Sequence, residues 1–511
     1  MTGLGTALLA AVTLTNASPS VVFLRDTEAA VESLVASIPR LTASAEQAAE
    51  RIWRNPYASI EVPRKPQWGF AEELWERAGG LAQIADGAFD TPDNVILLSS
   101  GVTPPDPLNG KLVVSFPAAG ADDRVNAVTD IVYGWMWCCE YAAALTRRCK
   151  RFPAVTKGLH AADSWIVNGC AWSPFNLPRL LPCDEKIAPG RLARDYLGKA
   201  RGLLRTMDGP ATRDAVLRAA GVVRAALDGG HQVGIAGLGH PIVIECTNEL
   251  KSRMKGICAF GNLPEAFSEA LNPGDTLVWI AYDGLDSHWA DYARHIRAAQ
   301  LDLVVSYAAW APPPSDGSVK AFIPQFWSGA DAEVTIPVPP YAMAPVSEIS
   351  RCVILRMLDA EVAATHPRRP DDSSAWGKAA LMSIDFSRKR PAPSGPLEWT
   401  EKGFTFVQSF DRKWALKGKT AAEYDMLRPL SSKLIAYERN RRFGLMDADG
   451  CELTSAKRDL IAPFGLFGMK ERDYAVFAER GLYGRMDSET GRAISERLSP
   501  EYPEEGGVTK Q

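Results

Sequence analysis

The sequence predicts an α/β protein with two tandem doubly wound parallel-sheet domains and a small, mainly-β C-terminal region. Short apolar runs alternate with amphipathic helical runs between residues 215 and 363, which is typical of a parallel sheet covered by helices. A similar order of elements occurs earlier in the chain, and aromatic, β-prone segments replace both after about residue 366. In this 511-residue chain we therefore expect α/β domains at 25–205 and 210–365, a linker at 366–396 and a β-rich repeat region at 397–500.

The first half is expected to begin with an apolar helix over 29–52 and to contain a long helix over 125–148. Its tandem relation to the second half depends on a shared order of strands and helices. The other elements expected here are a helix at 70–78 and strands at 58–62, 94–98, 112–116, 154–156 and 164–167.

The second half has the most regular pattern. A helix predicted over 215–227 ends at Asp228-Gly229-Gly230, which is a helix-stop signal. The run 276–281 is apolar almost throughout, as is usual for strands buried on both faces of a parallel sheet. The remaining elements expected are strands at 233–236, 256–260, 303–306 and 334–338 and helices at 242–254, 264–271, 288–300 and 347–363.

A short motif is repeated in the C-terminal region. Phe443-Gly444-Leu445-Met446-Asp447 recurs as Tyr483-Gly484-Arg485-Met486-Asp487, and a turn glycine follows each copy. An aromatic residue, a glycine and a turn at a fixed spacing predict tandem β-hairpins.

Two polar turns follow apolar strands in the second half, at 237–241 and 282–287. In open parallel sheets, ligands bind beyond the carboxyl ends of the strands, and free backbone N–H groups beside a helix N-terminus hold anions there. Asp283, Asp286 and Ser287 are also good helix N-caps, so ligand binding and capping both remain open for them. The binding residues predicted at these turns are Gly237, Gly239, Tyr282, Asp283, Gly284, Asp286 and Ser287.

The residues around these two turns resemble the sugar isomerase (SIS) domain family. Gly237-Leu238-Gly239-His240-Pro241 is similar to the family's Gly-x-Gly-His/Lys-Ser turn, and the run 275–284 is similar to its second signature, a Gly-Asp turn with an apolar strand and a polar turn. The run 69–81 resembles a helix of SIS proteins, and the repeat around Phe443 and Tyr483 resembles the WG-type β-repeat. The resemblance covers about residues 30–365 and implies SIS, flavodoxin-like domains that bind a sugar or sugar phosphate.

The chain departs from the SIS pattern at positions that matter for phosphate. Pro241 stands where the first turn usually has serine, and Ala281 and Asp283 stand where serines are expected in the second. An aspartate beside a dianionic phosphate weakens binding through like-charge repulsion. In the first half, the run 116–123 has no Ser/Thr-rich turn, so that half is expected to be degenerate.

His240 is the candidate proton-transfer residue for an aldose–ketose interconversion, with Glu245 or Glu249 as its partner carboxylate. The two glutamates are four residues apart on a predicted helix and so share a face. The structural alternative is that His240 caps the helix while the glutamates pair with Lys251 or Arg253. The tryptophans at 68, 75, 135, 137 and 165 suit sugar stacking, but in a chain with 14 tryptophans packing in the core or at a domain interface is the more common role.

Composition excludes several classes of partner. The formal net charge of −4 argues against nucleic-acid binding, which needs clustered positive charge. No apolar run has the length of a membrane span, and no basic residue precedes the apolar stretch at 4–14, so a cytoplasmic protein is expected. The nine cysteines form no Cys-x-x-Cys pair, and no metal or cofactor is expected.

These observations leave three functional hypotheses. The first is a sugar-phosphate isomerase, which the SIS resemblance implies. The second is a non-catalytic SIS-fold sensor or scaffold whose C-terminal β-repeats bind a protein partner. The third is an enzyme with altered chemistry on an unphosphorylated sugar. SIS relatives are often dimers, so a homodimer is also expected.

Overall fold

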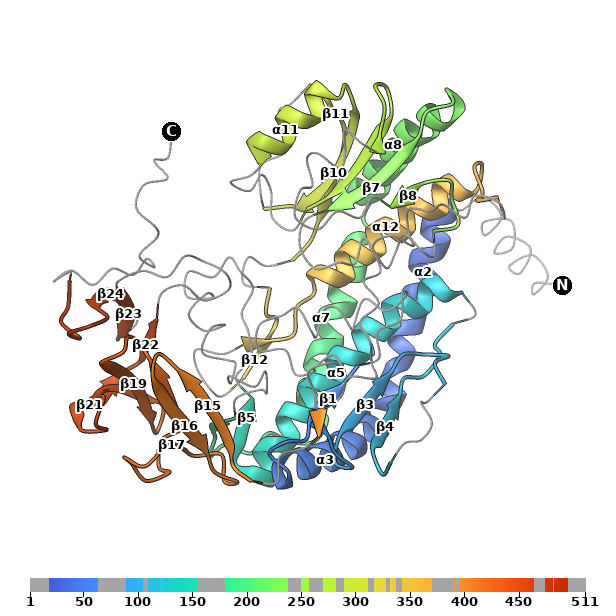
Figure 1. The fold of residues 1–511 in the computed structure, drawn as a ribbon. Helices are drawn as coiled ribbons and strands as arrows, with labels where there is room; N and C mark the ends of the chain where they lie inside the picture. The colour runs from blue at the N-terminus through green and yellow to red at the C-terminus, as the bar shows by residue number, and fades with distance from the viewer. Residues whose placement is uncertain are drawn as a thin grey trace.

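The fold is taken from a computed structural model (Figure 1). All structural statements below concern the residues that this structure describes, which are 18–62, 89–103, 109–120, 122–153, 180–237, 250–256, 270–281, 289–310, 317–327, 331–336, 342–369, 390–391, 395–463, 474–480 and 482–494.

A five-stranded parallel sheet forms the centre of the second half. Every pair of neighbouring strands in it is parallel, which confirms the predicted fold class for this part of the chain. The strands, in their spatial order, are β11 (Val319–Gln325), β10 (Asp302–Ala308), β9 (Thr276–Ile280), β7 (Val233–Gly237) and β8 (Lys255–Gly256).

The edge strand β11 differs from the sequence prediction, which had placed the last strand at 334–338. Val334–Thr335 (β12) instead pairs antiparallel with Ala342–Met343 (β13), outside the parallel sheet. Lys320 and Pro324 interrupt the apolar pattern of β11. Proline is tolerated at a sheet edge because an edge strand leaves some N–H groups unpaired, so β11 forms there despite its weak signal.

Helices cover both faces of this sheet, as Figure 1 shows. Ile235, Val278 and Ile323 face the helices α8 (Pro210–Asp228) and α12 (Ser347–Ala363). On the opposite face, residues such as Trp279 pack with Ile296 of α11 (Trp289–Ala298). Alternation of the two buried faces along each strand explains why these strands are apolar almost throughout.

The N-terminal half contains a second parallel sheet. Its order is β1 (Ile60–Glu61), β3 (Val95–Leu98), β4 (Leu112–Ser115). The described helices of this half are α2 (Pro19–Ser33), α3 (Ile38–Arg54), α5 (Asp123–Cys149) and α7 (Arg191–Met207). Two short strand pairs also occur: β5 (Arg151–Pro153) is antiparallel to β6 (Leu180–Pro182), and β2 (Phe89–Asp90) is parallel to β14 (Arg390–Pro391).

The predicted single helix over 29–52 is two helices. α2 ends at Ser33, the 3₁₀ turn Leu34–Ser37 follows, and α3 begins at Ile38. Pro39 lies in the first turn of α3, where its missing N–H leaves no intrahelical hydrogen bond unmade, whereas it would break the interior of one continuous helix. The predicted helix at 70–78 and strands at 154–156 and 164–167 lie outside the described residues.

One hydrophobic core runs from the N-terminal sheet to the second sheet. It includes Val95 and Leu97 of β3, Trp137 of α5, and Ile235 of β7. α5 and α12 lie between the two sheets, and nearly every residue of α12 is buried (Figure 1). A helix buried on all sides needs neighbours on all sides. The boundary near residues 205–210 and the tandem origin of the halves stay predictions.

The C-terminal region consists of three antiparallel sheets. The first contains β15 (Leu397–Glu401), β16 (Phe404–Gln408) and β17 (Trp414–Leu416). The second contains β18 (Met426–Pro429), β19 (Leu434–Arg439), β20 (Arg442–Asp447) and β21 (Glu452–Arg458). The third contains β22 (Leu460–Pro463), β23 (Tyr474–Glu479) and β24 (Leu482–Asp487).

Both copies of the repeated motif lie in hairpins, β19–β20 and β23–β24. The β19–β20 loop has φ of 52° at Asn440 and 64° at Arg441, the left-handed pair that a two-residue hairpin turn requires. A third two-residue hairpin, β15–β16, turns at Lys402 and Gly403 with φ of 49° and 84°. The antiparallel character of the region is therefore established, while its assignment as WG-type repeats stays a prediction.

The C-terminal region contacts the N-terminal half through the turn after β16. The Arg412 guanidinium donates to the carbonyl oxygen of Ile52 and lies 6.0 Å from the centre of the Trp53 ring. The ring of Phe410 packs edge-on against Tyr57, with ring centres 6.4 Å apart. These contacts attach the first hairpin of the region to the end of α3.

Candidate functional site

The two polar turns predicted to bind an anion start at the same edge of the five-stranded sheet. β7 and β9 are hydrogen-bonded neighbours, and Gly237 lies opposite Ile280. Gly237 is the last residue of β7, and Ala281 follows the last residue of β9. The chain therefore leaves two adjacent strands at their carboxyl ends, where ligands bind in open parallel sheets.

Gly237 is the predicted site residue that the structure describes. The other predicted binding residues and the three candidate catalytic residues lie outside the described residues: Gly239, His240, Glu245, Glu249, Tyr282, Asp283, Gly284, Asp286 and Ser287. Their roles, both in ligand binding and in helix capping, stay predictions.

Gln325 is a polar residue of this edge that the sequence analysis missed. Its side chain is fully buried at the end of β11. Its Nε2 donates to the carbonyl oxygen of Ala281 at 3.0 Å and to Oγ of Ser306 at 3.1 Å, while its Oε1 accepts from Nε1 of Trp327 at 3.3 Å. Gln325 thus reaches across β10 and fixes the residue from which the second polar turn departs.

Two tryptophans lie next to this buried amide. Trp310 follows β10 and Trp327 follows β11, with ring centres 5.5 Å apart at an angle of 85°. Trp327 is buried, whereas Trp310 is 50% exposed. Trp310 therefore presents part of its indole at the carboxyl edge of the sheet. Of the tryptophans considered from sequence, Trp135 and Trp137 are buried in α5, and those at 68, 75 and 165 lie outside the described residues.

The N-terminus of α12 also lies at this edge, but a carboxylate already occupies its backbone donors. Oδ1 of Asp331 accepts from the N–H groups of Val346 and Ser347, both at 3.1 Å, and its Oδ2 accepts from Oγ of Ser347 at 2.6 Å. Ser350, one turn into α12, accepts from the N–H of Phe326 at 3.3 Å and so ties the helix to the end of β11. The described end of α12 is therefore a structural support of the edge and not an open anion site.

At the corresponding edge of the N-terminal sheet, side chains of α5 accept hydrogen bonds from residues that follow β3 and β4. Ser100, just after β3, donates its N–H and Oγ to the buried carboxylate of Asp130 on α5 at 3.0–3.2 Å. After β4, Oδ1 of Asn126 accepts from the N–H groups of Ala119 and Gly120. Side chains of α5 thus fill the positions that an anion would take. Ser100 is not among the site residues predicted from the sequence.

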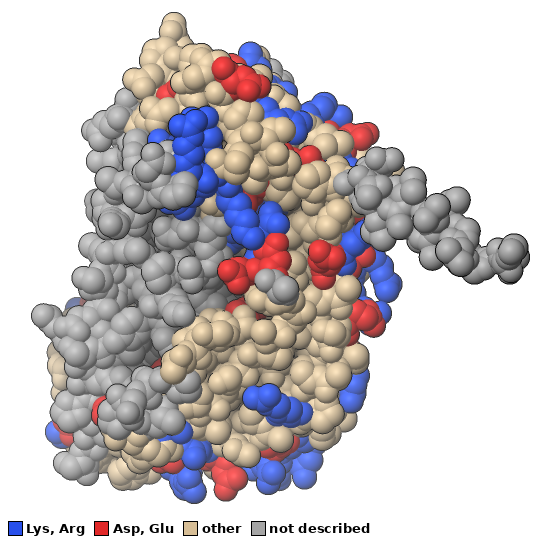
Figure 2. Space-filling view, turned by 90° about the vertical axis from the view of Figure 1, so that its right-hand side faces the viewer, with Lys and Arg blue, Asp and Glu red and all other residues tan. Residues whose placement is uncertain are grey.

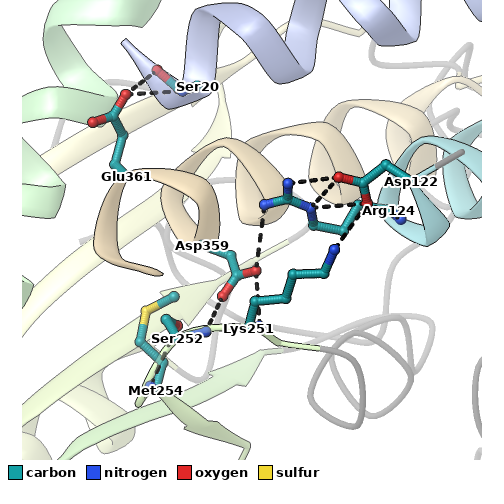
Figure 3. A network of polar contacts seen from close by, with 8 residues as sticks. All are labelled: Ser20, Asp122, Arg124, Lys251, Ser252, Met254, Asp359 and Glu361. Carbon is teal, nitrogen blue, oxygen red and sulfur yellow. Dashed lines mark hydrogen bonds and ion pairs between the residues drawn. The ribbon is translucent and has the colours of Figure 1, made fainter. Parts of the chain in front are cut away.

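A second polar network lies near the other end of α12, as Figure 3 shows. The fully buried carboxylate of Asp359 accepts from the N–H groups of Lys251 at 3.1 Å and Ser252 at 2.9 Å. Nη1 of Arg124 lies 4.0 Å from the same carboxylate. Asp359 thereby fixes the residues that follow the segment 238–249, which contains the three candidate catalytic residues.

Arg124 connects this network to Asp122 at the start of α5 (Figure 3). Hydrogen bonds from Arg124 hold the pKa of the Asp122 carboxyl well below its usual range. Nζ of Lys251 lies 3.3 Å from Oδ1 of Asp122, so the described partner of Lys251 is Asp122. Further along α12, Glu361 accepts from N–H and Oγ of Ser20 at 2.9 and 2.6 Å. α12 thus joins the beginning of the chain to the second half.

The described residues give no indication of two other kinds of site. No group of three or more His, Cys, Asp or Glu side chains among them is arranged to hold a metal ion. None of the described helices is both long and apolar enough to cross a membrane. On the face drawn in Figure 2, a group of basic side chains lies directly above a group of acidic ones.

No family model and no curated protein matches this chain. Several solved structures are similar to it. The C-terminal domain of glucosamine-fructose-6-phosphate aminotransferase from Francisella tularensis is 11% identical over 67% of this chain and 94% of that chain, with a TM-score of 0.41. A glucosamine-6-phosphate deaminase from Thermotoga maritima is 9% identical over 68% and 96%, with a TM-score of 0.32. A phosphoheptose isomerase from Francisella tularensis is 12% identical over 35% and 100%, with a TM-score of 0.28.

Proposed function

We propose that the carboxyl edge of β7, β9, β10 and β11 binds a sugar or sugar phosphate. The observation that carries this proposal is the register of β7 with β9, which starts both polar turns side by side at one edge. Backbone N–H groups of such turns attract the anionic group of a ligand. Trp310, half exposed beside the second turn's strand, supplies the apolar surface for the sugar carbons.

The proposed reaction is aldose–ketose isomerisation. A base removes the proton from the carbon next to the carbonyl group of the open-chain sugar, and the same proton equivalent returns to the former carbonyl carbon. One proton also passes from the hydroxyl oxygen to the former carbonyl oxygen, in the same direction along the sugar, so the product is an isomer and no cofactor is consumed. We assign the base to His240 and the second proton transfer to Glu245 or Glu249, since histidine and carboxylates perform such steps near neutral pH.

Ligand binding is tested by calorimetric titration and thermal shift with a panel of aldose and ketose phosphates and the matching free sugars. Trp310→Ala should weaken binding by about 1 kcal/mol, roughly fivefold, because stacking on an aromatic ring contributes energy of that order. Leu453→Ala is the matched control, since Leu453 is 54% exposed in the C-terminal region and far from this edge in sequence. If no member of the panel shifts the melting temperature or titrates, the proposed ligand class is wrong.

Catalysis is tested separately from binding. His240→Ala should abolish interconversion of a bound sugar phosphate, and Glu245→Gln and Glu249→Gln identify the partner carboxylate by the larger loss of turnover. Exchange of solvent deuterium into the sugar, followed by NMR, detects proton abstraction even where net conversion is slow. A ligand that binds without exchange or conversion would refute the assignment of His240 as a base.

The second candidate function is a non-catalytic sugar-phosphate sensor or scaffold whose C-terminal hairpins bind a protein. The observation that favours it is the exposure of two large apolar side chains of that region, Leu453 at 54% and Ile494 at 57%. Capture of a partner by the full-length chain, lost on the double substitution Leu453→Ser and Ile494→Ser, would support this function. Light scattering of the purified chain tests the proposed homodimer independently.

A further inference from the structure

A cleft between α2 and α7 carries charged groups that the proposed sugar site does not use. Its volume is about 320 Å³, which is at the small end of the range for metabolite pockets. We refer to it as the α2–α7 cleft, and its lining residues are Arg25, Glu28, Ala29 and Glu32 of α2 and Arg201, Leu204 and Arg205 of α7. None of them belongs to the strands or turns of the carboxyl edge.

Helical spacing explains how two helices present this set of charges. On α7, Arg201 and Arg205 are four residues apart and lie on one face, with the buried Leu204 beneath them. On α2, Arg25, Glu28 and Glu32 follow one another at spacings of three and four residues and form one stripe. The cleft is therefore the seam where these two stripes meet.

One ion pair crosses the seam, and two arginines do not take part in it. Nε of Arg201 lies 2.5 Å from Oε2 of Glu32. Arg25 and Arg205 are exposed, and neither forms a hydrogen bond or an ion pair with any residue in the described part of the chain. Two guanidinium groups from opposite helices thus keep their N–H donors available for a planar or tetrahedral oxyanion.

Glu28 supplies an acceptor beside these donors. Its Oε1 is buried and has no hydrogen-bond partner among the described residues. Burial, together with the negative charge of Asp208, raises the pKa of the Glu28 carboxyl, while Arg205, Arg213 and Arg25 act in the opposite direction through their charges. A buried acceptor without a donor is unfavourable, and a hydroxyl group of a ligand would satisfy it.

We propose that the α2–α7 cleft binds a small oxyanion that carries a neighbouring hydroxyl group. Arg25 and Arg205 hold the oxyanion, and Glu28 accepts the hydrogen bond from the hydroxyl. Phosphate monoesters and carboxylates share this chemistry, and they are distinguished below. None of the residues that line the cleft belongs to the carboxyl edge, so we assign the cleft to a second ligand and not to the sugar substrate.

The test is calorimetric titration of the full-length chain with four probes: glycerol 3-phosphate, glycerate, inorganic phosphate and glycerol. Glycerol 3-phosphate should bind at least tenfold more tightly than inorganic phosphate, which lacks the neighbouring hydroxyl, and glycerol should not bind. A stronger response to glycerate than to glycerol 3-phosphate would assign the cleft to carboxylates. Equal binding of inorganic phosphate and glycerol 3-phosphate would contradict the role given to Glu28.

Arg25→Ala and Arg205→Ala should each weaken the tighter probe at least tenfold. Both residues are exposed on helices and alanine favours a helix, so these variants should fold. The matched control is Arg218→Ala, because Arg218 is an exposed arginine of α8 that does not line the cleft. Loss of affinity in all three variants alike would indicate non-specific attraction of anions and would overturn the proposal.

A separate variant distinguishes this site from the proposed sugar site. Trp310→Ala should leave the binding of the tighter probe unchanged, because Trp310 lies at the carboxyl edge. If Trp310→Ala removes the binding of the probe while Arg25→Ala and Arg205→Ala retain it, the probe occupies the carboxyl edge and the α2–α7 cleft is not a binding site.

Discussion

Replacing Asp359 by alanine should release the segment that follows the candidate catalytic residues. The Asp359 carboxylate is fully buried and accepts from two backbone N–H groups, those of Lys251 and Ser252. Hydrogen bonds to a charged group contribute about 1.5–3 kcal/mol each, so the loss of both should cost roughly 3–6 kcal/mol. Arg124, 4.0 Å away, keeps its bond to Asp122 and limits the cost to the lower part of this range.

Hydrogen exchange followed by mass spectrometry measures this loss where it occurs. A decrease of about 3 kcal/mol in local stability corresponds to exchange roughly 150-fold faster for amides that open locally. We expect this acceleration in peptides that cover residues 250–256. Local exchange is the better readout, since a chain of 511 residues with several sheets is not expected to unfold in one two-state step.

Two variants of α12 control this experiment. Asp359→Asn keeps one oxygen acceptor and should accelerate exchange less than alanine does. Glu361→Gln alters another buried carboxylate of the same helix, but one that holds Ser20, so exchange at 250–256 should not change. The reasoning is refuted if Asp359→Ala leaves exchange at 250–256 unchanged, or if Glu361→Gln accelerates it equally. Sugar-phosphate affinity should also fall in Asp359→Ala, since the segment 238–249 ends at the released anchor.

Three further predictions concern single side chains. Gln325→Leu removes the partner of the Ala281 carbonyl, so it should lower the melting temperature and weaken sugar-phosphate binding; unchanged affinity would show that Gln325 does not support the second turn. Gly444→Ala should destabilise the C-terminal region by about 1–3 kcal/mol in urea unfolding, because a Cβ there would lie 2.5 Å from Cζ of Tyr437. Gly418→Ala controls for this steric contact, because a Cβ at Gly418 would have no atom within 4 Å, although the positive φ of Gly418 adds a backbone cost of its own. Asp122 has a lowered pKa in the folded chain, so its contribution to stability is present above the ordinary aspartate pKa of about 3.9 and is lost as the pH falls below it. Asp122→Asn should therefore reduce the loss of stability in acid, and an unchanged acid transition would contradict this assignment.

The central strands were predictable because strands buried on both faces of a sheet consist of consecutive apolar residues. Residues 233–236, 276–281 and 303–306 are short apolar runs between turn signals, and the structure has β7, β9 and β10 there. The common direction of parallel strands then places their carboxyl ends together. The sequence pattern therefore predicts the sheet edge on which the site is proposed.

Gln325 could not be placed from the sequence because its strand depends on a neighbour. β11 contains Lys320 and Pro324, and its buried positions alternate with partly exposed ones. Pairing with β10 supplies the hydrogen bonds that the local sequence does not specify. A single glutamine in a segment that is not predicted to be a strand gives no indication of burial. Once the strand is known, a buried glutamine at its end indicates a polar contact with the neighbouring strands.

The third hairpin of the C-terminal region was missed for a different reason. In β19–β20, Tyr437 lies opposite Gly444, where the absence of a side chain gives the tyrosine ring room. In β15–β16, Trp399 lies opposite Phe406 and the two rings stack with centres 4.8 Å apart. Two aromatic rings fill the space that one ring and a glycine fill in the other hairpin. The packing is preserved while the motif changes, so a motif search finds only the copies that keep the glycine.

The two parallel sheets differ in the side chain that binds the described backbone just after their strands. After β3, the N–H and hydroxyl of Ser100 are already bound to the buried carboxylate of Asp130, so an incoming anion would have to displace a negative charge held inside the core. After β9, the described neighbour is the neutral amide of Gln325, which donates to the carbonyl oxygen of Ala281. The carboxylate at the first edge binds the N–H and hydroxyl that directly follow β3, whereas the carboxylate at the second edge, that of Asp331, binds the N-terminus of α12. The second edge is therefore the one on which we place the ligand.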